Sequence, residues 1–281
     1  LRKNSFVTLT NTNVAREGLA RDANVSQLDF KLANKKNMYA ISGQAGMSHV
    51  LNTFGTKSGY KWLAAAEKIS GNFKFKLSQE NITDDYDPND LGFLNINNVK
   101  NSYLFARYAL YEPFSIFNSA RHDLEVFYTR SYRQDQFMNF ALSYFTIYSL
   151  RSFHAISLNF AVEPIETNDF FETRTFDQSY RFPTNFTYGG FFSSDYSRPF
   201  ALDVSTSQRL FDEQGRYNTY YEISPRFRPN DKLFFVLEHN WGVRNNEMGF
   251  VANLNDSIIF GRRDVKEYES SVTGNYIFNN R

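Results

Sequence analysis

Two adjacent stretches of alternating residues, within Gln136–Val162, constrain the fold more than any other part of this 281-residue chain. The first places every second residue on a largely apolar face: Met138, Phe140, Leu142, Tyr144, Thr146, Tyr148 and Leu150. After Arg151-Ser152 the alternation restarts, with small and polar residues opposite Ile156, Leu158, Phe160 and Val162. Because side chains alternate across a strand, the pattern predicts two long antiparallel strands joined by a tight turn.

The length of these two strands favours a membrane protein. Strands of soluble sheets average about five or six residues, whereas a transmembrane β-strand has about ten, with lipid on one side and water on the other. The alternation recurs along the chain and gives roughly fourteen strands. We therefore expect one domain, 1–281, with an all-β fold: a large antiparallel transmembrane β-barrel with further strands missing at one or both ends. A soluble β-sandwich is the main alternative.

Composition agrees with a β fold and excludes several functions. Aromatic residues make up 18% of the chain, with 30 Phe and 18 Tyr, and these residue types favour strands. No run of about eighteen apolar residues occurs, which excludes a transmembrane helix. Without cysteine, the chain has no disulfide, thiolate nucleophile or cysteine-ligated metal. The 31 basic and 30 acidic residues are dispersed, which argues against a nucleic-acid partner.

Connection lengths predict which end of the barrel faces outward. The long connections are Ala15–Asn24, Glu80–Asn98, Glu163–Phe182 and Asn245–Lys266. The short ones are Asn34–Asn37, Ser70–Asn72, Arg151–Ser152 and Arg228–Asp231. Outer-membrane barrels have long extracellular loops and short periplasmic turns. We thus expect one extracellular rim, formed by Asp84–Asp90, Glu163–Phe182 and the three residues Arg262, Arg263 and Asp264, to meet any ligand or surface lipoprotein.

One connection is strongly acidic and offers a candidate metal site. Its acidic side chains are Asp84, Asp85, Asp87 and Asp90, with Asn89 among them. Calcium binds several carboxylate and carbonyl oxygens, although the spacing here is not that of an EF-hand. The alternative is a solvated loop in which Asp-Pro-Asn-Asp forms turns. Calcium is the one cofactor that the sequence suggests.

Charged residues recur on the strand face opposite the apolar one. They are Arg107, Arg121, Asp123, Glu125, Asp203, Arg209, Glu222, Arg226, Glu238 and Arg244. A catalytic interpretation would use Asp123 or Glu125 as an acid or base. We favour a structural one, in which charges of both signs line a wet lumen and pair across strands. The sequence contains no phosphate-binding loop and no Ser-His-Asp order.

The four histidines lie on separate predicted strands and lack the spacing of metal ligands. They are His49, His122, His154 and His239. The last three fall on the predicted lipid face, which suggests interfacial depth or a protein partner. Arg262 and Arg263 offer guanidinium groups that could bind a phosphate or carboxylate, or could simply lie in an exposed loop.

Several short motifs give the chain a family resemblance. The most specific are Tyr86–Phe93, with the sequence YDPNDLGF, and Ile259–Val265, with IFGRRDV. Supporting motifs are Asn11–Val14, Arg21–Asn24, Ser194–Tyr196 and Ile223–Arg226. Over its whole length the chain resembles a domain-of-unknown-function barrel that follows a family-9-like carbohydrate-binding module in Bacteroidota outer-membrane proteins. The resemblance implies a preceding module and further strands, and it brings no catalytic residues.

Together these observations predict a protein of the outer membrane of a Gram-negative bacterium. We expect a non-enzymatic barrel that acts as scaffold, channel or partner in a surface complex related to glycans. Its expected partners are the lipid bilayer, other outer-membrane proteins or surface lipoproteins, and a glycan ligand. An outer-membrane hydrolase with a site at the barrel mouth and a soluble sugar-binding β-sandwich are the alternatives.

Overall fold

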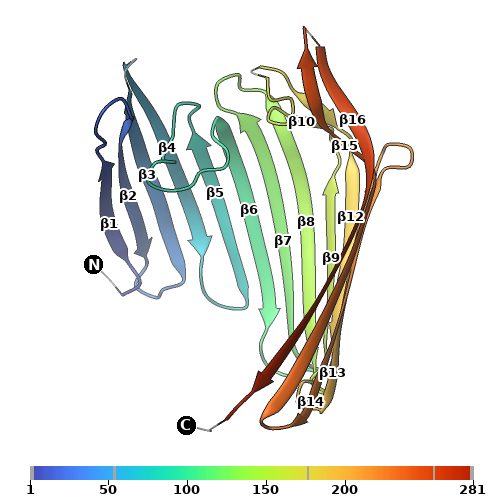
Figure 1. The fold of residues 1–281 in the computed structure, drawn as a ribbon. Coiled ribbons are helices and arrows are strands. Elements are labelled where there is room, and N and C mark those ends of the chain that lie inside the picture. The colour runs from blue at the N-terminus through green and yellow to red at the C-terminus, as the bar shows by residue number, and fades with distance from the viewer. Residues whose placement is uncertain (1–2, 53–54, 176, 256, 279–281) are drawn as a thin grey trace. The chain divides into compact units, whose positions relative to one another are not determined.

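The computed structural model describes residues 3–52, 55–175, 177–255 and 257–278, and its regular elements are β-strands (Figure 1). They are β1 (Phe6–Val14), β2 (Asp22–Ala33), β3 (Tyr39–Asn52), β4 (Gly55–Lys68), β5 (Phe73–Ile82), β6 (Val99–Leu110), β7 (Phe117–Ser131), β8 (Phe137–Leu150), β9 (Ala155–Glu163), β10 (Thr167–Asp169), β11 (Tyr180–Phe182), β12 (Asn185–Ser193), β13 (Phe200–Phe211), β14 (Tyr217–Asn230), β15 (Leu233–Leu254) and β16 (Ser257–Tyr276). No helix long and apolar enough to cross a membrane occurs in these residues.

Fourteen of the strands form one large sheet in which chain neighbours pair with each other. The exception is the step from β9 to β12, because β10 and β11 form a separate two-stranded hairpin between them. The prediction of an all-β, antiparallel fold with about fourteen main strands is therefore confirmed. Within the described residues the sheet is open, with β1 and β16 as its edges, and closure into a barrel stays a prediction.

The chain divides into two compact units, which are described separately below. Unit 1 comprises Leu1–Arg107 and Glu125–Phe140, and unit 2 comprises Tyr108–Leu124 and Ala141–Arg281. The prediction of a single domain stays a prediction.

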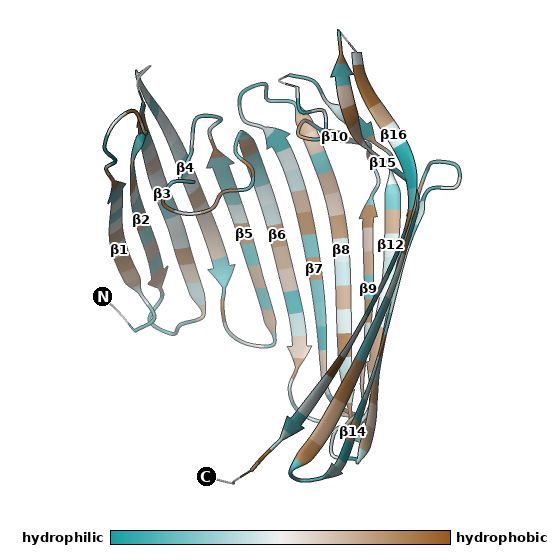
Figure 2. Cartoon of the chain, viewed as in Figure 1, coloured by the Kyte–Doolittle hydropathy of each residue, from teal (hydrophilic) through white to brown (hydrophobic). Residues whose placement is uncertain are grey.

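In unit 2, the strands of the alternating hairpin pair antiparallel and have the predicted faces. Tyr144 of β8 is opposite Phe160 of β9, and Phe160 is opposite Tyr188 of β12. Apolar positions thus continue across three strands as one face. Along the strands of the sheet, hydrophobic and hydrophilic residues are interspersed (Figure 2). Leu158 on this face is 45% exposed and Trp241 of β15 is 43% exposed, so large apolar side chains remain uncovered.

Unit 1 has the same organisation. Leu28 of β2 is opposite Ala45 of β3, and Ala45 is opposite Trp62 of β4, which places all three on one apolar face. The other face is polar and hydrogen-bonded: Gln44 donates to Asp29 (2.7 Å), and Lys31 and Glu67 form an ion pair (3.2 Å). The two faces of both units therefore differ as the sequence pattern predicts.

One predicted loop is wrong. Asn245–Lys266 is not a loop but the paired ends of β15 and β16, in which Glu247 is opposite Arg263. Register shifts between Arg244 and Glu247 and between Phe250 and Ala252 interrupt the alternation, so a strict period of two fails to detect these strands.

Candidate functional site: loops over the polar face

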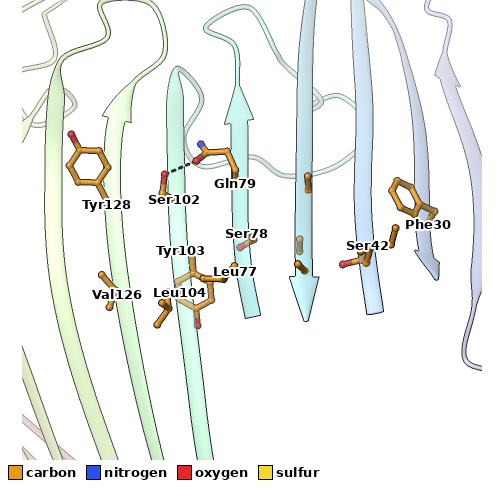
Figure 3. A pocket seen from close by; sticks show the side chains of 14 residues that line it. Phe30, Ser42, Leu77, Ser78, Gln79, Ser102, Tyr103, Leu104, Val126 and Tyr128 are labelled. Carbon is orange, nitrogen blue, oxygen red and sulfur yellow. Dashed lines mark hydrogen bonds between the residues drawn. The ribbon is translucent and has the colours of Figure 1, made fainter. Parts of the chain in front are cut away.

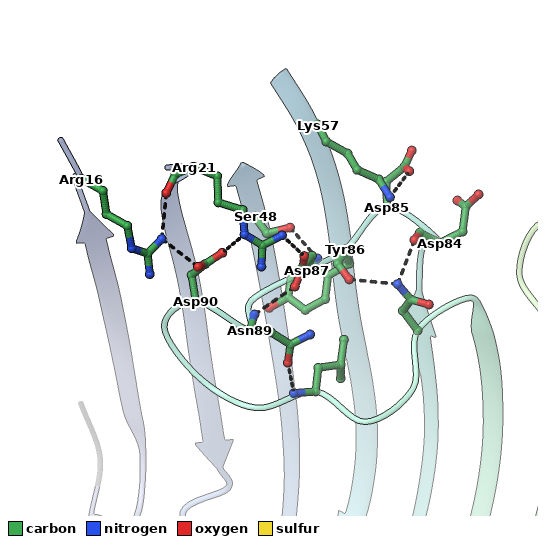
Figure 4. Close-up of polar contacts among 12 residues, drawn as sticks. Arg16, Arg21, Ser48, Lys57, Asp84, Asp85, Tyr86, Asp87, Asn89 and Asp90 are labelled. Atoms are coloured by element: carbon green, nitrogen blue, oxygen red, sulfur yellow. Dashed lines mark hydrogen bonds and ion pairs between the residues drawn. The ribbon is translucent and has the colours of Figure 1, made fainter. Parts of the chain in front are cut away.

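In unit 1, the connection from β5 to β6 folds back onto the polar face of the sheet. We call residues 83–98 the acidic loop (Figure 4). Tyr86 in this loop is only 3% exposed, and its backbone packs directly over Gly59 of β4. The backbone N–H of Asp87 donates to the hydroxyl of buried Ser48 (2.9 Å). The acidic loop is therefore a packed part of unit 1.

The four predicted calcium ligands each pair with basic side chains from neighbouring segments. Asp84 pairs with Arg133 (3.2 Å), Asp85 with Lys57 (3.1 Å), Asp87 with Arg21 (3.3 Å), and Asp90 with both Arg16 (2.8 Å) and Arg21 (2.7 Å). The side-chain oxygen of Asn89 accepts a hydrogen bond from the backbone N–H of Leu94 (2.7 Å). Among the described residues, no group of three or more acidic or histidine side chains is placed to hold a metal. The geometry thus gives the calcium site no support, and it stays an untested prediction.

A small pocket of about 280 Å³ lies between the acidic loop and the polar face. Side chains of Thr10, Gln27 and Lys61 contribute a hydroxyl, an amide and an ammonium group. Tyr86 and Phe93 line the same pocket, and Phe93 is 86% exposed. Burial raises the pKa of the Tyr86 hydroxyl. Several hydrogen-bonding groups therefore adjoin an exposed aromatic ring.

A second depression in unit 1, of about 660 Å³, is largely apolar (Figure 3). It forms where small side chains, including Ala64 and Ala66 of β4, lie beside the larger Phe30, Leu77 and Tyr128. Ser102 donates to Gln79 at its edge (2.5 Å). Since this lining contains no charged side chain, it offers shape and apolar contact rather than chemistry.

In unit 2, the long connection from β9 to β12 is also a packed segment. We call residues 164–184, which include β10 and β11, the hairpin loop. The guanidinium of Arg216 lies over the rings of Phe182 (4.5 Å) and Phe211 (4.6 Å). Arg209 approaches the same two rings at 5.2 and 5.0 Å. Arg216 is only 5% exposed and donates to the hydroxyl of Tyr180 (3.2 Å).

The hairpin loop also contacts the far ends of β15 and β16. Glu172 accepts a hydrogen bond from the backbone N–H of Phe250 (2.7 Å), and Asn253 donates to Thr175 (3.0 Å). Tyr180 stacks on Phe260 with ring centroids 4.7 Å apart. These strand ends, expected to be a loop, thus act as a support for the hairpin loop.

The three predicted rim residues lie in β16, where each already has a protein partner. Arg262 pairs with Glu213, Arg263 pairs with Glu247 (2.7 Å), and Asp264 accepts from the backbone N–H of Asn246 (2.8 Å). Burial would raise the pKa of Glu213, but hydrogen bonds from Arg216 and Arg262 outweigh it and lower that pKa. Arg262 and Arg263 therefore each already have a carboxylate partner within the protein.

The predicted lumen charges bond mainly to residues that the sequence pattern did not single out. Within the set, Arg121 pairs with Asp123 (3.3 Å). Further partners are Glu163 for Arg209 (3.1 Å), Glu247 (3.3 Å) and Glu267 (2.6 Å) for Arg244, Tyr196 for Asp203, Ser205 for Glu222 (3.2 Å) and Ser271 for Glu238 (3.2 Å). Arg107 lies against Phe105 (5.0 Å), Arg226 lies over Tyr196 (4.4 Å), and Glu125 is half-buried on β7. Hydroxyl and aromatic partners carry no charge pattern, so sequence alone gave no signal for them.

The histidines each face a hydroxyl group. His122 is 2.8 Å from the Tyr144 hydroxyl and 3.1 Å from that of Thr146. His49 adjoins Ser58 (2.7 Å), His154 adjoins Ser152 (3.0 Å), and His239 adjoins Ser270 (2.7 Å). A hydrogen-bond partner lowers the cost of placing such a ring on an apolar face.

Comparison with known proteins gives a family without an assigned function. A family model described as a domain of unknown function (DUF5916) matches residues 1–281, so the chain belongs to that family. This confirms the resemblance to a family of unknown function, while its Bacteroidota setting and carbohydrate-binding module stay predictions. No curated protein and no solved structure matches the chain.

Proposed function

We propose that this member of the DUF5916 family forms the wall of a transmembrane β-barrel in the outer membrane of a Gram-negative bacterium. The observation that carries this proposal is the uncovered apolar face of long strands in both units. Leu9, Ile41, Tyr60 and Leu77 in unit 1 are each about half exposed or more, as are Phe200 and Val272 in unit 2.

Such a face is costly in water. Each Å² of apolar surface left in water costs about 25 cal/mol, and contiguous patches beyond a few hundred Å² mark contact with a membrane or a partner. Lipid on one face and water on the other would satisfy both faces of these strands. Because unpaired backbone groups cannot lie in lipid, β1 and β16 require further strand pairing in the assembled protein.

We propose that the barrel is non-enzymatic and acts as a scaffold or partner in a glycan-handling complex at the cell surface. The pocket beneath the acidic loop supports this role. A sugar is bound by hydrogen bonds to its hydroxyls and by an apolar ring against its C–H face, and Thr10, Gln27, Lys61 and Phe93 offer these groups. The ion pairs around it favour a structural use of the charges over acid–base catalysis.

A channel is the second candidate, and the polar face favours it. Charges of both signs line this face in unit 2, as Arg209 with Glu163 and Arg244 with Glu267 illustrate. Ion conductance through planar bilayers that contain the purified protein would support the channel. Absence of ion conductance, together with a stable partner protein recovered from solubilised membranes, would support the scaffold.

Cysteine labelling tests the membrane topology, because the chain has no native cysteine. Single cysteines at Asn89, Asn168 and Asn255 should react with a membrane-impermeant maleimide on intact cells, since the connections there are on the proposed extracellular side. A cysteine at Asn230, where β14 ends before the short turn to β15, should react only after the cells are lysed.

Two outcomes would contradict the proposal. Labelling at Asn230 without labelling at the other three positions would indicate the opposite topology. A protein that stays soluble and monomeric without detergent would exclude the transmembrane wall and would favour the soluble β-sandwich.

A further inference from the structure

Unit 2 has a groove beside two of its short turns. This groove belongs neither to the pocket beneath the acidic loop nor to the predicted extracellular rim. Its volume is about 810 Å³, and it lies between the β8–β9 turn and the β12–β13 turn. Its lining combines the basic Arg151 and Arg198 with the aromatic Phe153, Phe192 and Phe200. We propose that this groove binds the phosphate headgroup of a glycerophospholipid, and this inference rests on the proposed membrane location.

The charges of the groove favour an anionic group. Arg151 lies in the turn, is exposed, and forms no ion pair with any residue that the structure describes. Arg198 is 75% exposed at its side chain and pairs with Asp195 at 3.3 Å. The two guanidinium groups of the lining outnumber its one carboxylate, that of Asp195.

The carboxylate of Asp195 already has partners within the protein. Its carboxylate accepts from the backbone N–H of Ser197 (2.8 Å) and contacts Arg198. Hydrogen bonds from Ser197, and then the charge of Arg198, lower the pKa of Asp195. A third arginine, Arg228, donates to the carbonyl of Ser197 (3.4 Å) and adds positive charge beside the groove.

The apolar part of the groove is continuous with the apolar face of unit 2. Phe192 is opposite Ile156 of β9 and Val204 of β13, which both belong to that face. Phe153 and Phe200 are 72% and 58% exposed. The acyl chains of a bound lipid therefore lie along the strands in this proposal, while its phosphate contacts Arg151 and Arg198. A guanidinium group can bind two phosphate oxygens at once. Aromatic side chains are also typical of the level of a bilayer where headgroups lie.

Native mass spectrometry of the full chain in maltoside micelles tests this site. The probes are a phosphatidylglycerol and a diacylglycerol with the same acyl chains, which differ in the phosphate headgroup. We expect the wild type to retain one phosphatidylglycerol in preference to diacylglycerol. The double variant R151Q/R198Q should bind phosphatidylglycerol about tenfold more weakly.

The matched control is R181Q, which removes an equally exposed arginine from β11, beyond the opposite end of β9. It should leave the lipid preference unchanged. If the protein integrates into membranes but the wild type and the double variant bind phosphatidylglycerol equally, the lipid site is contradicted and the proposed function is not. A wild type that fails to integrate overturns both the site and the proposed function. Because both arginines are exposed turn residues, circular dichroism should give the same β spectrum for all variants.

Discussion

The acidic loop of unit 1 and the hairpin loop of unit 2 are both held in place, but by different forces. Asp84, Asp87 and Asp90 tie the acidic loop to arginines of the neighbouring connections. The hairpin loop is held by the buried Arg216, which lies against the rings of Phe182 and Phe211, and by hydrogen bonds to Phe250 and Asn253. Exposed ion pairs weaken as salt is added, whereas buried cation–π contacts are much less screened.

This difference indicates that the composition of a loop predicts whether ion pairs or contacts with aromatic rings hold it to the sheet. An acidic segment can be held by many weak pairs, since each exposed ion pair contributes about 0–1 kcal/mol. An aromatic segment can depend on one buried guanidinium, because a desolvated cation–π contact contributes about 2 kcal/mol. Sensitivity to a single substitution should therefore be higher in the hairpin loop, except where the acidic loop contacts the sheet directly.

That direct contact is at Gly59, where we expect the largest effect. A Cβ added here would overlap the backbone of Asp85 and Tyr86, so Gly59→Ala should displace the acidic loop. If this overpacking destabilises the packed position of the acidic loop by about 3 kcal/mol, the amides of the loop should exchange roughly a hundredfold faster. Hydrogen exchange of residues 83–98 measures it. The control is Gly92→Ala in the same loop, where the nearest atom, the Pro88 carbonyl oxygen, is 3.9 Å from the added Cβ. Equal exchange in both variants would contradict the packing described.

A smaller but clear effect is expected in the hairpin loop. Arg216→Ala removes the guanidinium that lies against Phe182 and Phe211 and leaves Glu213 with Arg262 alone. A loss of about 2 kcal/mol should speed amide exchange of residues 164–184 about thirtyfold, at low and high salt alike. The exposed Arg181→Ala serves as the control and should change exchange little. A strong salt dependence of the Arg216→Ala effect would mean that charge pairing, rather than ring contact, holds the loop.

The smallest effect is expected for one exposed arginine of unit 1. Arg21→Gln removes the pairs to Asp87 and Asp90 but leaves the pair between Arg16 and Asp90. The acidic loop should exchange about threefold faster at low salt, since such pairs contribute roughly 0.5–1 kcal/mol. At about 1 M salt, where the Debye length is near 3 Å, wild type and variant should become alike. A difference that persists at high salt would contradict the comparison of the two loops.

The sequence by itself determined the strands and their faces. The rows that begin at Met138 and at Ile156 lie on one face as the alternation predicts, because a slip of one residue would move every apolar side chain of a strand to the other face. Where bulges break that period, as between Arg244 and Glu247, the prediction failed and a strand pair was taken for a loop.

Only the tertiary structure decided what the loops do. The carboxylates of Asp87 and Asp90 looked like cation ligands in the sequence, and their actual partners, Arg16 and Arg21, come from a connection more than sixty residues away. Likewise, nothing local to Arg216 indicates that Phe182 would cover it. Alternation is a local property of each strand, whereas the choice of partner for a loop side chain depends on how the sheet brings distant connections together.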